Sequence, residues 1–306
     1  MQAARLSGIV PPLSTPMTET FEIDIPSLEK LITFQLDAGV HGLFALGSTS
    51  EVAFLTDAQR ATVLDVVVRC VAGQVPVLAG TIDMTTTRVI EHARAAEKAR
   101  ADALVVTAPF YTRIGQAEIK AHFRQVHEAV DLPIFAYDIP VAVHSKLERS
   151  TVLELAEQQI ISGLKDSSGD EANFRGLVMA QAAHPDFSVF TGSELLADVA
   201  LFMGASGVVP GLGNVDPVGY VRLYEAAHRG DWVAARQEQE RLYRLFDIVN
   251  VGLRRMAIGS SAMGAFKTAL QLRGIIATNV VGRPQLRLND DEVAQVRRAL
   301  VAANLL

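Results

Sequence analysis

Eight short apolar runs, each followed by an amphipathic segment, constrain the fold of this 306-residue chain more than any other feature. The runs end in small or polar residues and begin near positions 8, 42, 76, 103, 133, 161, 187 and 206. Continuously apolar strands that alternate with helices are typical of a parallel sheet whose faces are covered by helices. Eight such units in about 230 residues predict an α/β fold, a (β/α)8 TIM barrel, rather than a doubly wound sheet with a second domain.

The segments between the runs have apolar residues at helical spacing. Thr56 and Gln59 mark one helix start, because a threonine cap answered three residues later by glutamine forms a capping box. The glycine-rich fingerprint of dinucleotide-binding folds is missing after the first run, which also favours the barrel. The predicted helices cover residues 26–38, 57–71, 87–100, 116–130, 151–158, 172–182, 194–203 and 217–229.

From residue 231 onward the pattern is only helical, most clearly over Trp232 to Val249 and over Asp290 to Asn304. Glycines at 252, 259 and 264 interrupt the region between these two segments. No linker rich in proline or serine separates this part from the rest. We therefore expect a barrel domain over residues 1–230 and a C-terminal helical extension over residues 231–306 that packs on the barrel.

The composition is that of an ordinary globular protein, with 49% hydrophobic and 20% charged residues. The net charge of −6 includes no basic block, so we expect neither nucleic acid nor a membrane surface as a partner. Residues 1–7 lack the apolar core of a signal segment, and we expect a cytoplasmic protein. Cys70 lies on an apolar helix face and is interpreted as core packing. The seven histidines form no cluster typical of a metal site, so neither a metal nor a cofactor is expected.

Lys165 stands where the sixth apolar run breaks into small polar residues. A lysine at the end of a buried strand loses hydration, and desolvation disfavours the charged form of its amine. A neutral amine attacks ketones, so the position suggests a Schiff-base lysine that acts on a carbonyl substrate. The alternative is a lysine whose side chain extends from the strand end into solvent.

Other candidates fall at the carboxyl ends of the predicted strands, which form the active-site face of a β/α barrel. The turn with Ser48, Thr49 and Glu51 offers amides and hydroxyls to a carboxylate, although Ser48 and Glu51 also have capping-box spacing. Tyr111 and Tyr137 follow neighbouring strands. They are either amphipathic residues that close the strand ends or members of a proton relay.

The last two predicted strands also end in candidates. Glu194 is expected to open the helix after the seventh strand, where it complements the helix dipole or faces a substrate. Glycines between residues 207 and 213 would let a substrate approach the backbone closely, or they serve a turn. Among the histidines, only His144 lies near a predicted active-site loop.

Three motifs, in this order, resemble the dihydrodipicolinate synthase and N-acetylneuraminate lyase family of class I aldolases over nearly the whole chain. They are the Gly-Ser-Thr-x-Glu turn at 47–51, the Tyr-x-x-Pro segment at 137–140 and the Gly-Leu-Lys-Asp strand at 163–166. The resemblance implies a β/α barrel with C-terminal helices, usually assembled as a homotetramer.

The resemblance also implies roles for individual residues. Lys165 would condense with the ketone of pyruvate or another 2-keto acid, while Ser48 and Thr49 bind its carboxylate. Tyr137 would shuttle protons, and Ser48 would link it to Tyr111 from a neighbouring subunit. The expected substrate-binding set is completed by Ser167, Gly192, Glu194 and Val209.

Departures from the family pattern narrow the expected substrate. Ala142 stands where the synthases carry an arginine for aspartate semialdehyde, and Gly211 stands where the sialic-acid lyases usually carry a serine. The residues around Ala142 and Lys165 are closest to members that act on 2-keto-3-deoxy sugar acids. We therefore expect an aldolase that releases pyruvate and an aldehyde. The alternatives are a dehydratase, a condensing enzyme of the synthase type and a non-catalytic protein that binds 2-keto acids.

Overall fold

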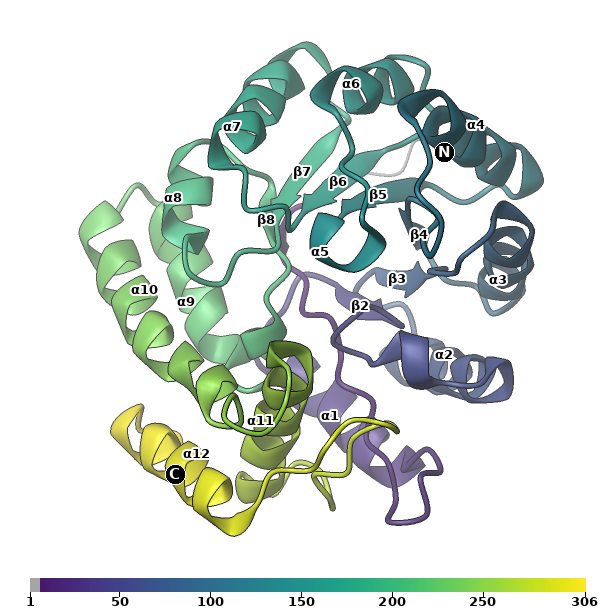
Figure 1. Cartoon of the computed structure of the whole chain (residues 1–306). Coiled ribbons are helices and arrows are strands. Elements are labelled where there is room, and N and C mark those ends of the chain that lie inside the picture. The colour runs from purple at the N-terminus through teal and green to yellow at the C-terminus, as the bar shows by residue number, and fades with distance from the viewer. Residues whose placement is uncertain (1–5) are drawn as a thin grey trace.

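Eight parallel strands form one curled sheet at the centre of the computed structural model, which describes residues 6–306 (Figure 1). The order is β1-β8-β7-β6-β5-β4-β3-β2. The strands at the two ends of this order, β1 and β2, are joined through the residues that follow β1. Leu13 N–H donates to Phe44 O at 2.8 Å, and Phe44 N–H donates to Pro11 O at 3.0 Å. This closes a TIM barrel, as predicted. The strands are β1 (Gly8–Ile9), β2 (Leu43–Ala45), β3 (Val77–Gly80), β4 (Ala103–Thr107), β5 (Ile134–Asp138), β6 (Gly163–Asp166), β7 (Ser188–Thr191) and β8 (Gly207–Val208).

Helices surround the sheet and bury its outer face (Figure 1). The capping box at Thr56 and Gln59 is confirmed and starts α2. Cys70 on the same helix is half-buried against the core. The helices of this layer are α1 (Ile25–Asp37), α2 (Asp57–Val71), α3 (Thr86–Lys98), α4 (Gln116–Ala129), α6 (Arg149–Glu157), α7 (Glu171–Ala180), α8 (Ala197–Phe202) and α9 (Pro217–His228).

Two elements differ from the sequence prediction. Helix α8 begins at Ala197, so Glu194 does not open it and its side chain is engaged elsewhere. The short helix α5 (Pro140–Val143) follows β5 directly and was not predicted, because four residues are too few to show helical periodicity.

The C-terminal part consists of α10 (Trp232–Phe246), α11 (Ile258–Leu272) and α12 (Asp290–Ala302). Figure 1 shows α12 beside α11 at the edge of the molecule. The sequence predicts that the glycines at 259 and 264 interrupt the helical region, but this is wrong, because both lie within α11. Gly264 permits close packing, because a methyl group there would lie 3.2 Å from Leu288. These helices share a core with β1, β8 and α9, and the division at residue 230 stays a prediction.

The expectation about a signal segment depends on the N-terminal residues, of which 1–5 lie outside the described residues. Within residues 6–306, none of the helices is long and apolar enough to cross a membrane. The carboxyl ends of the eight strands converge on one face of the barrel.

Candidate active site

Lys165 is the third residue of β6 and is only 6% exposed. Strand register pairs it with Tyr137 on β5 and with Phe190 on β7, so its side chain points into the barrel. The Nζ atom lies 4.0 Å from the centroid of the Tyr137 ring and 5.1 Å from that of Phe44. The aromatic rings enclose the amine, which therefore does not extend into solvent as the alternative interpretation required.

The turn that follows β2 lies at the carboxyl-end face of the barrel, as Lys165 does, and presents free hydroxyl groups. Ser48 is exposed and Thr49 is half-buried, and neither side chain hydrogen-bonds to another residue of the described chain. Ser50 has the opposite role: its buried Oγ accepts a hydrogen bond from Gly47 N–H at 3.1 Å and donates to Leu13 O at 2.5 Å. The hydroxyl of Ser50 thus fixes the turn, which leaves those of Ser48 and Thr49 for a ligand.

Glu51 precedes a short 3-10 helix but its side chain does not cap it, which corrects the alternative that capping-box spacing suggested. The following short 3-10 helix, Val52–Phe54, has no side-chain cap. The carboxylate of Glu51 is buried and forms an ion pair with Lys267 of α11. The sequence gives no local signal for this contact, because the two residues are far apart along the chain.

Gly192 lies against the lysine from the end of β7. A methyl group at this position would lie 3.2 Å from Lys165 Cε and would collide with Ser167 Oγ. A pocket of about 160 Å³ opens between the ends of β6 and β7 and is lined by Ser167 and Gly192. Val209 follows β8, is buried, and donates its N–H to Thr191 O at 2.8 Å. The absence of a side chain at Gly192 therefore keeps space beside the amine.

Glu194 joins the loops that follow β7 and β8. Its Oε1 accepts a hydrogen bond from Gly211 N–H at 2.8 Å. Burial raises the pKa of the Glu194 carboxyl, while hydrogen bonds from the backbone and the charge of Lys165 oppose this shift. A methyl group on Gly211 would lie 2.9 Å from Glu194 Oε1 and 3.3 Å from Thr49 Oγ1. Glu194 and Thr49 therefore flank the same glycine at the mouth of the barrel.

Tyr111 is not brought to Lys165 within one chain. It has a left-handed backbone with φ of 78°, and its side chain is 86% exposed. A tyrosine that closed its own strand end would bury its ring, so this finding differs from that interpretation. The expected link from Tyr111 to a neighbouring subunit stays a prediction.

Helix α5 stands at the end of β5 and carries Ala142, which is exposed. His144 is also exposed and ends the helix in a left-handed conformation with φ of 58°. Lys146 forms an ion pair with buried Asp138, which also accepts Leu147 N–H at 3.1 Å. Burial raises the pKa of Asp138, and Lys146 opposes the shift. The ion pair anchors the loop that carries Ala142 to the strand next to Lys165.

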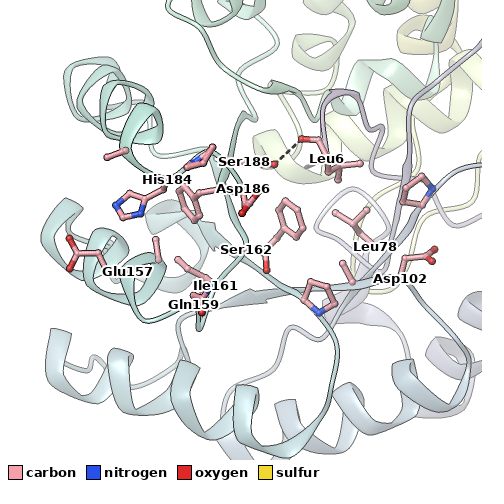
Figure 2. A pocket seen from close by; sticks show the side chains of 18 residues that line it. Leu6, Leu78, Asp102, Glu157, Gln159, Ile161, Ser162, His184, Asp186 and Ser188 are labelled. Atoms are coloured by element: carbon pink, nitrogen blue, oxygen red, sulfur yellow. Dashed lines mark hydrogen bonds between the residues drawn. The ribbon is translucent and has the colours of Figure 1, made fainter. Parts of the chain in front are cut away.

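A larger cavity of about 630 Å³ lies at the other end of the barrel (Figure 2). Leu78, Ser162 and Ser188 line it from the amino-terminal parts of the strands, and Ser188 Oγ donates to Leu6 O at 2.8 Å (Figure 2). None of the candidate residues at the strand carboxyl ends lines this cavity. In residues 6–306, no group of three or more His, Cys, Asp or Glu side chains is arranged to hold a metal ion.

Comparison with known proteins assigns the chain to a family over nearly its whole length. The model of the Dihydrodipicolinate synthetase family matches residues 5–303. The chain belongs to this family. Its members are class I lyases and aldolases, and the chain is an enzyme of that type.

Curated relatives support the assignment at the level of the whole chain. An uncharacterized DapA-like lyase of Halobacterium salinarum is 36% identical over 301 residues, which cover 98% of this chain and 95% of the relative. A 4-hydroxy-tetrahydrodipicolinate synthase of Desulfotalea psychrophila is 32% identical over 285 residues, 93% of each chain.

Solved structures share the whole fold. YagE, a prophage protein of the dihydrodipicolinic acid synthase family from E. coli K12, was crystallised in complex with pyruvate. It is 30% identical, superposes with a TM-score of 0.93, and the match covers 99% of this chain and 100% of YagE. Dihydrodipicolinate synthase from Bacteroides thetaiotaomicron is 32% identical with a TM-score of 0.91, covering 97% and 98% of the two chains.

Proposed function

We propose that this enzyme forms a Schiff base between Lys165 and a 2-keto acid, and cleaves a 2-keto-3-deoxy sugar acid to pyruvate and an aldehyde. The observation that carries the proposal is the placement of Nζ, 4.0 Å from the Tyr137 ring centroid and without an ion pair to any residue from 6 to 306. An amine that is free of a carboxylate partner is available to attack a carbonyl carbon.

The chemistry follows from that amine. Nζ adds to the C2 carbonyl of the substrate, and loss of water gives a protonated imine. Removal of a proton from the C4 hydroxyl then breaks the C3–C4 bond, releases the aldehyde and moves the electron pair into the imine. We assign this proton transfer to Tyr137, and protonation at C3 followed by hydrolysis releases pyruvate and regenerates Lys165.

The binding of the keto acid is assigned to neighbouring groups. The unpartnered hydroxyls of Ser48 and Thr49 are suited to the substrate carboxylate, because a charged acceptor strengthens hydrogen bonds. Ser167, Gly192, Glu194 and Val209 would surround the rest of the substrate. We also propose that Tyr111 completes the relay in a neighbouring subunit of a homotetramer, since its ring is exposed in the single chain. The pyruvate bound to YagE supports pyruvate as the common product.

A condensing reaction of the synthase type is the second candidate, and the names of the relatives at 32% identity favour it. It requires recognition of the carboxylate of aspartate semialdehyde. Ala142 supplies no guanidinium for this purpose, and the half-buried Glu194 carboxyl would repel a second carboxylate when ionised. These two residues favour a substrate tail with hydroxyl groups.

The proposal is tested by a screen of 2-keto-3-deoxy sugar acids for pyruvate release, run beside borohydride trapping with pyruvate. We expect release from at least one acid and a reduced pyruvate adduct on Lys165, located by peptide mass spectrometry. A dehydratase would expel water without releasing pyruvate. A label on Lys146 or Lys267 in place of Lys165 would overturn the mechanism, and trapping without any turnover would indicate a binding protein.

A further inference from the structure

We propose that Lys267, on the C-terminal helix α11, is a positioning residue that holds the Ser48–Thr49 turn in shape for the keto-acid carboxylate, acting through Glu51. The inference rests on the proposed function, because it assigns a carboxylate to that turn. Lys267 lies outside the barrel strands and does not reach the reacting atoms itself. Its influence passes through one buried side chain.

The ion pair between Lys267 and Glu51 is fully enclosed by protein. The two residues are each only 1% exposed. Lys267 Nζ also donates a hydrogen bond to Val280 O at 2.8 Å, and Glu51 Oε2 accepts one from Gly282 N–H at 2.5 Å. The Glu51 carboxylate is thus held by α11 on one oxygen and by the segment between α11 and α12 on the other.

The turn depends on Glu51 for its shape. Glu51 has a left-handed backbone with φ of 61°, which is unfavourable for a residue other than glycine. Its N–H donates to Ser48 O at 3.0 Å, so the strained residue closes the turn that carries the two free hydroxyls. A fixed side chain therefore maintains a backbone conformation that the sequence does not favour locally.

The same helix approaches the other side of the site. A methyl group on Gly211 would lie 3.0 Å from the ring of Phe266, the residue before Lys267, and 3.3 Å from Thr49 Oγ1. Helix α11 therefore supports the turn after β2 and the loop after β8 at adjacent positions. A shift of Lys267 would therefore move Thr49 relative to the loop after β8.

A buried ion pair is a costly way to obtain stability alone, because desolvation of the two charges offsets much of their attraction. Burial lowers the pKa of Lys267, and the charge of Glu51 opposes that shift. Replacing a buried ion pair by well-packed apolar side chains is often neutral or stabilising. The pair instead fixes direction and distance, which is what a binding turn requires.

The test compares Lys267→Met, Glu51→Gln and the double variant with Arg255→Met as control. Arg255 forms an ion pair with Glu292, at 2.8 Å, in the same C-terminal region. Borohydride trapping at Lys165 is measured as a function of concentration for pyruvate and for methyl pyruvate, which has the same carbonyl without the charge. The double variant carries no unpaired buried charge, so it separates positioning from failure to fold.

We expect each single variant to raise the half-saturating pyruvate concentration by about tenfold to a hundredfold, as when well-placed hydrogen bonds to a charged group are lost. The value for methyl pyruvate should change little, and the maximal trapping should be retained. The double variant should fold and keep the raised value for pyruvate, while Arg255→Met should match the wild type.

Equal changes for the two ketones, or a double variant with the wild-type half-saturation for pyruvate, would overturn the positioning role and leave only a structural one. Absence of trapping at Lys165 in the wild-type enzyme would instead overturn the proposed function. The two failures are therefore distinguishable within one experiment.

Discussion

Lys165 Nζ lies 4.0 Å from the centroid of the Tyr137 ring, because the two residues are paired in register on neighbouring parallel strands. Side chains in such a pair project from the same face of the sheet, here into the barrel. A nucleophile and a proton-transfer group are thereby held on two rigid strands. The relationship makes the role of Tyr137 open to direct test.

Replacing Tyr137 by phenylalanine should lower turnover by about 10²- to 10⁴-fold, the usual effect of losing a general acid or base. The ring that faces Lys165 is kept, so pyruvate trapping at Lys165 should survive at least in part. Steady-state kinetics and trapping by mass spectrometry would measure the two effects. Turnover within a few-fold of the wild type would show that Tyr137 only packs against the lysine.

Gly192→Ala should suppress imine formation, because the added methyl group would collide with Ser167 Oγ and lie 3.2 Å from Lys165 Cε. We expect the rate of borohydride trapping to fall by at least about tenfold, since small displacements at a reacting centre are costly. Gly259→Ala is the matched control, as no atom lies within 4 Å of a methyl group there. Adding Ser167→Ala should restore part of the rate, and an unchanged rate in Gly192→Ala would contradict the prediction.

The wild-type enzyme should show negligible condensation of pyruvate with aspartate semialdehyde, because Ala142 offers no partner for the second carboxylate. Ala142→Arg should raise kcat/KM for aspartate semialdehyde by at least about tenfold, through a charge-assisted hydrogen bond. Val141→Arg is the control, since Val141 is 82% exposed on the same short helix. A wild-type kcat/KM that is higher for aspartate semialdehyde than for every sugar acid tested would show that the specificity argument is wrong.

Acid should destabilise the enzyme through His122. This residue is buried, and a hydrogen bond of 2.9 Å joins its Nδ1 to Thr86 Oγ1. Burial lowers the pKa of His122 to about 4. Below about pH 6.5 the unfolded chain therefore binds a proton that the folded chain does not bind, and stability is lost as the pH falls toward 4. The loss from this residue at pH 5 is about 2 kcal/mol.

The measurement is urea unfolding at pH 7.5 and pH 5, at one protein concentration, for the wild type and His122→Asn. The variant should be less stable at pH 7.5, and the gap between the two proteins should narrow by about 2 kcal/mol at pH 5. His127→Asn, on the exposed face of the same helix, should follow the wild type. A gap that does not change with pH would exclude His122 as the source.

The strand and helix pattern was predictable because it depends on local hydrophobic periodicity, and the eight strands begin within two residues of the expected positions. Helix α11 was missed because its glycines argue against a helix locally, whereas contact with Leu288 requires a small residue at Gly264. The predicted start of α8 at residue 194 was wrong for a similar reason. Glu194 suits a helix start by propensity, but a hydrogen bond from Gly211 on another loop holds it outside the helix.

Local sequence patterns were enough to predict the barrel, the position of Lys165 at a strand end and the motifs that resemble the family, because each depends on residues close together in the chain. Three features became visible only in the folded chain: Phe44 and Tyr137 enclose the amine, Glu51 pairs with Lys267, and Tyr111 is exposed. Such contacts join segments that are distant in the chain. The partner of a buried charge is therefore determined by the folded structure and not by neighbouring residues.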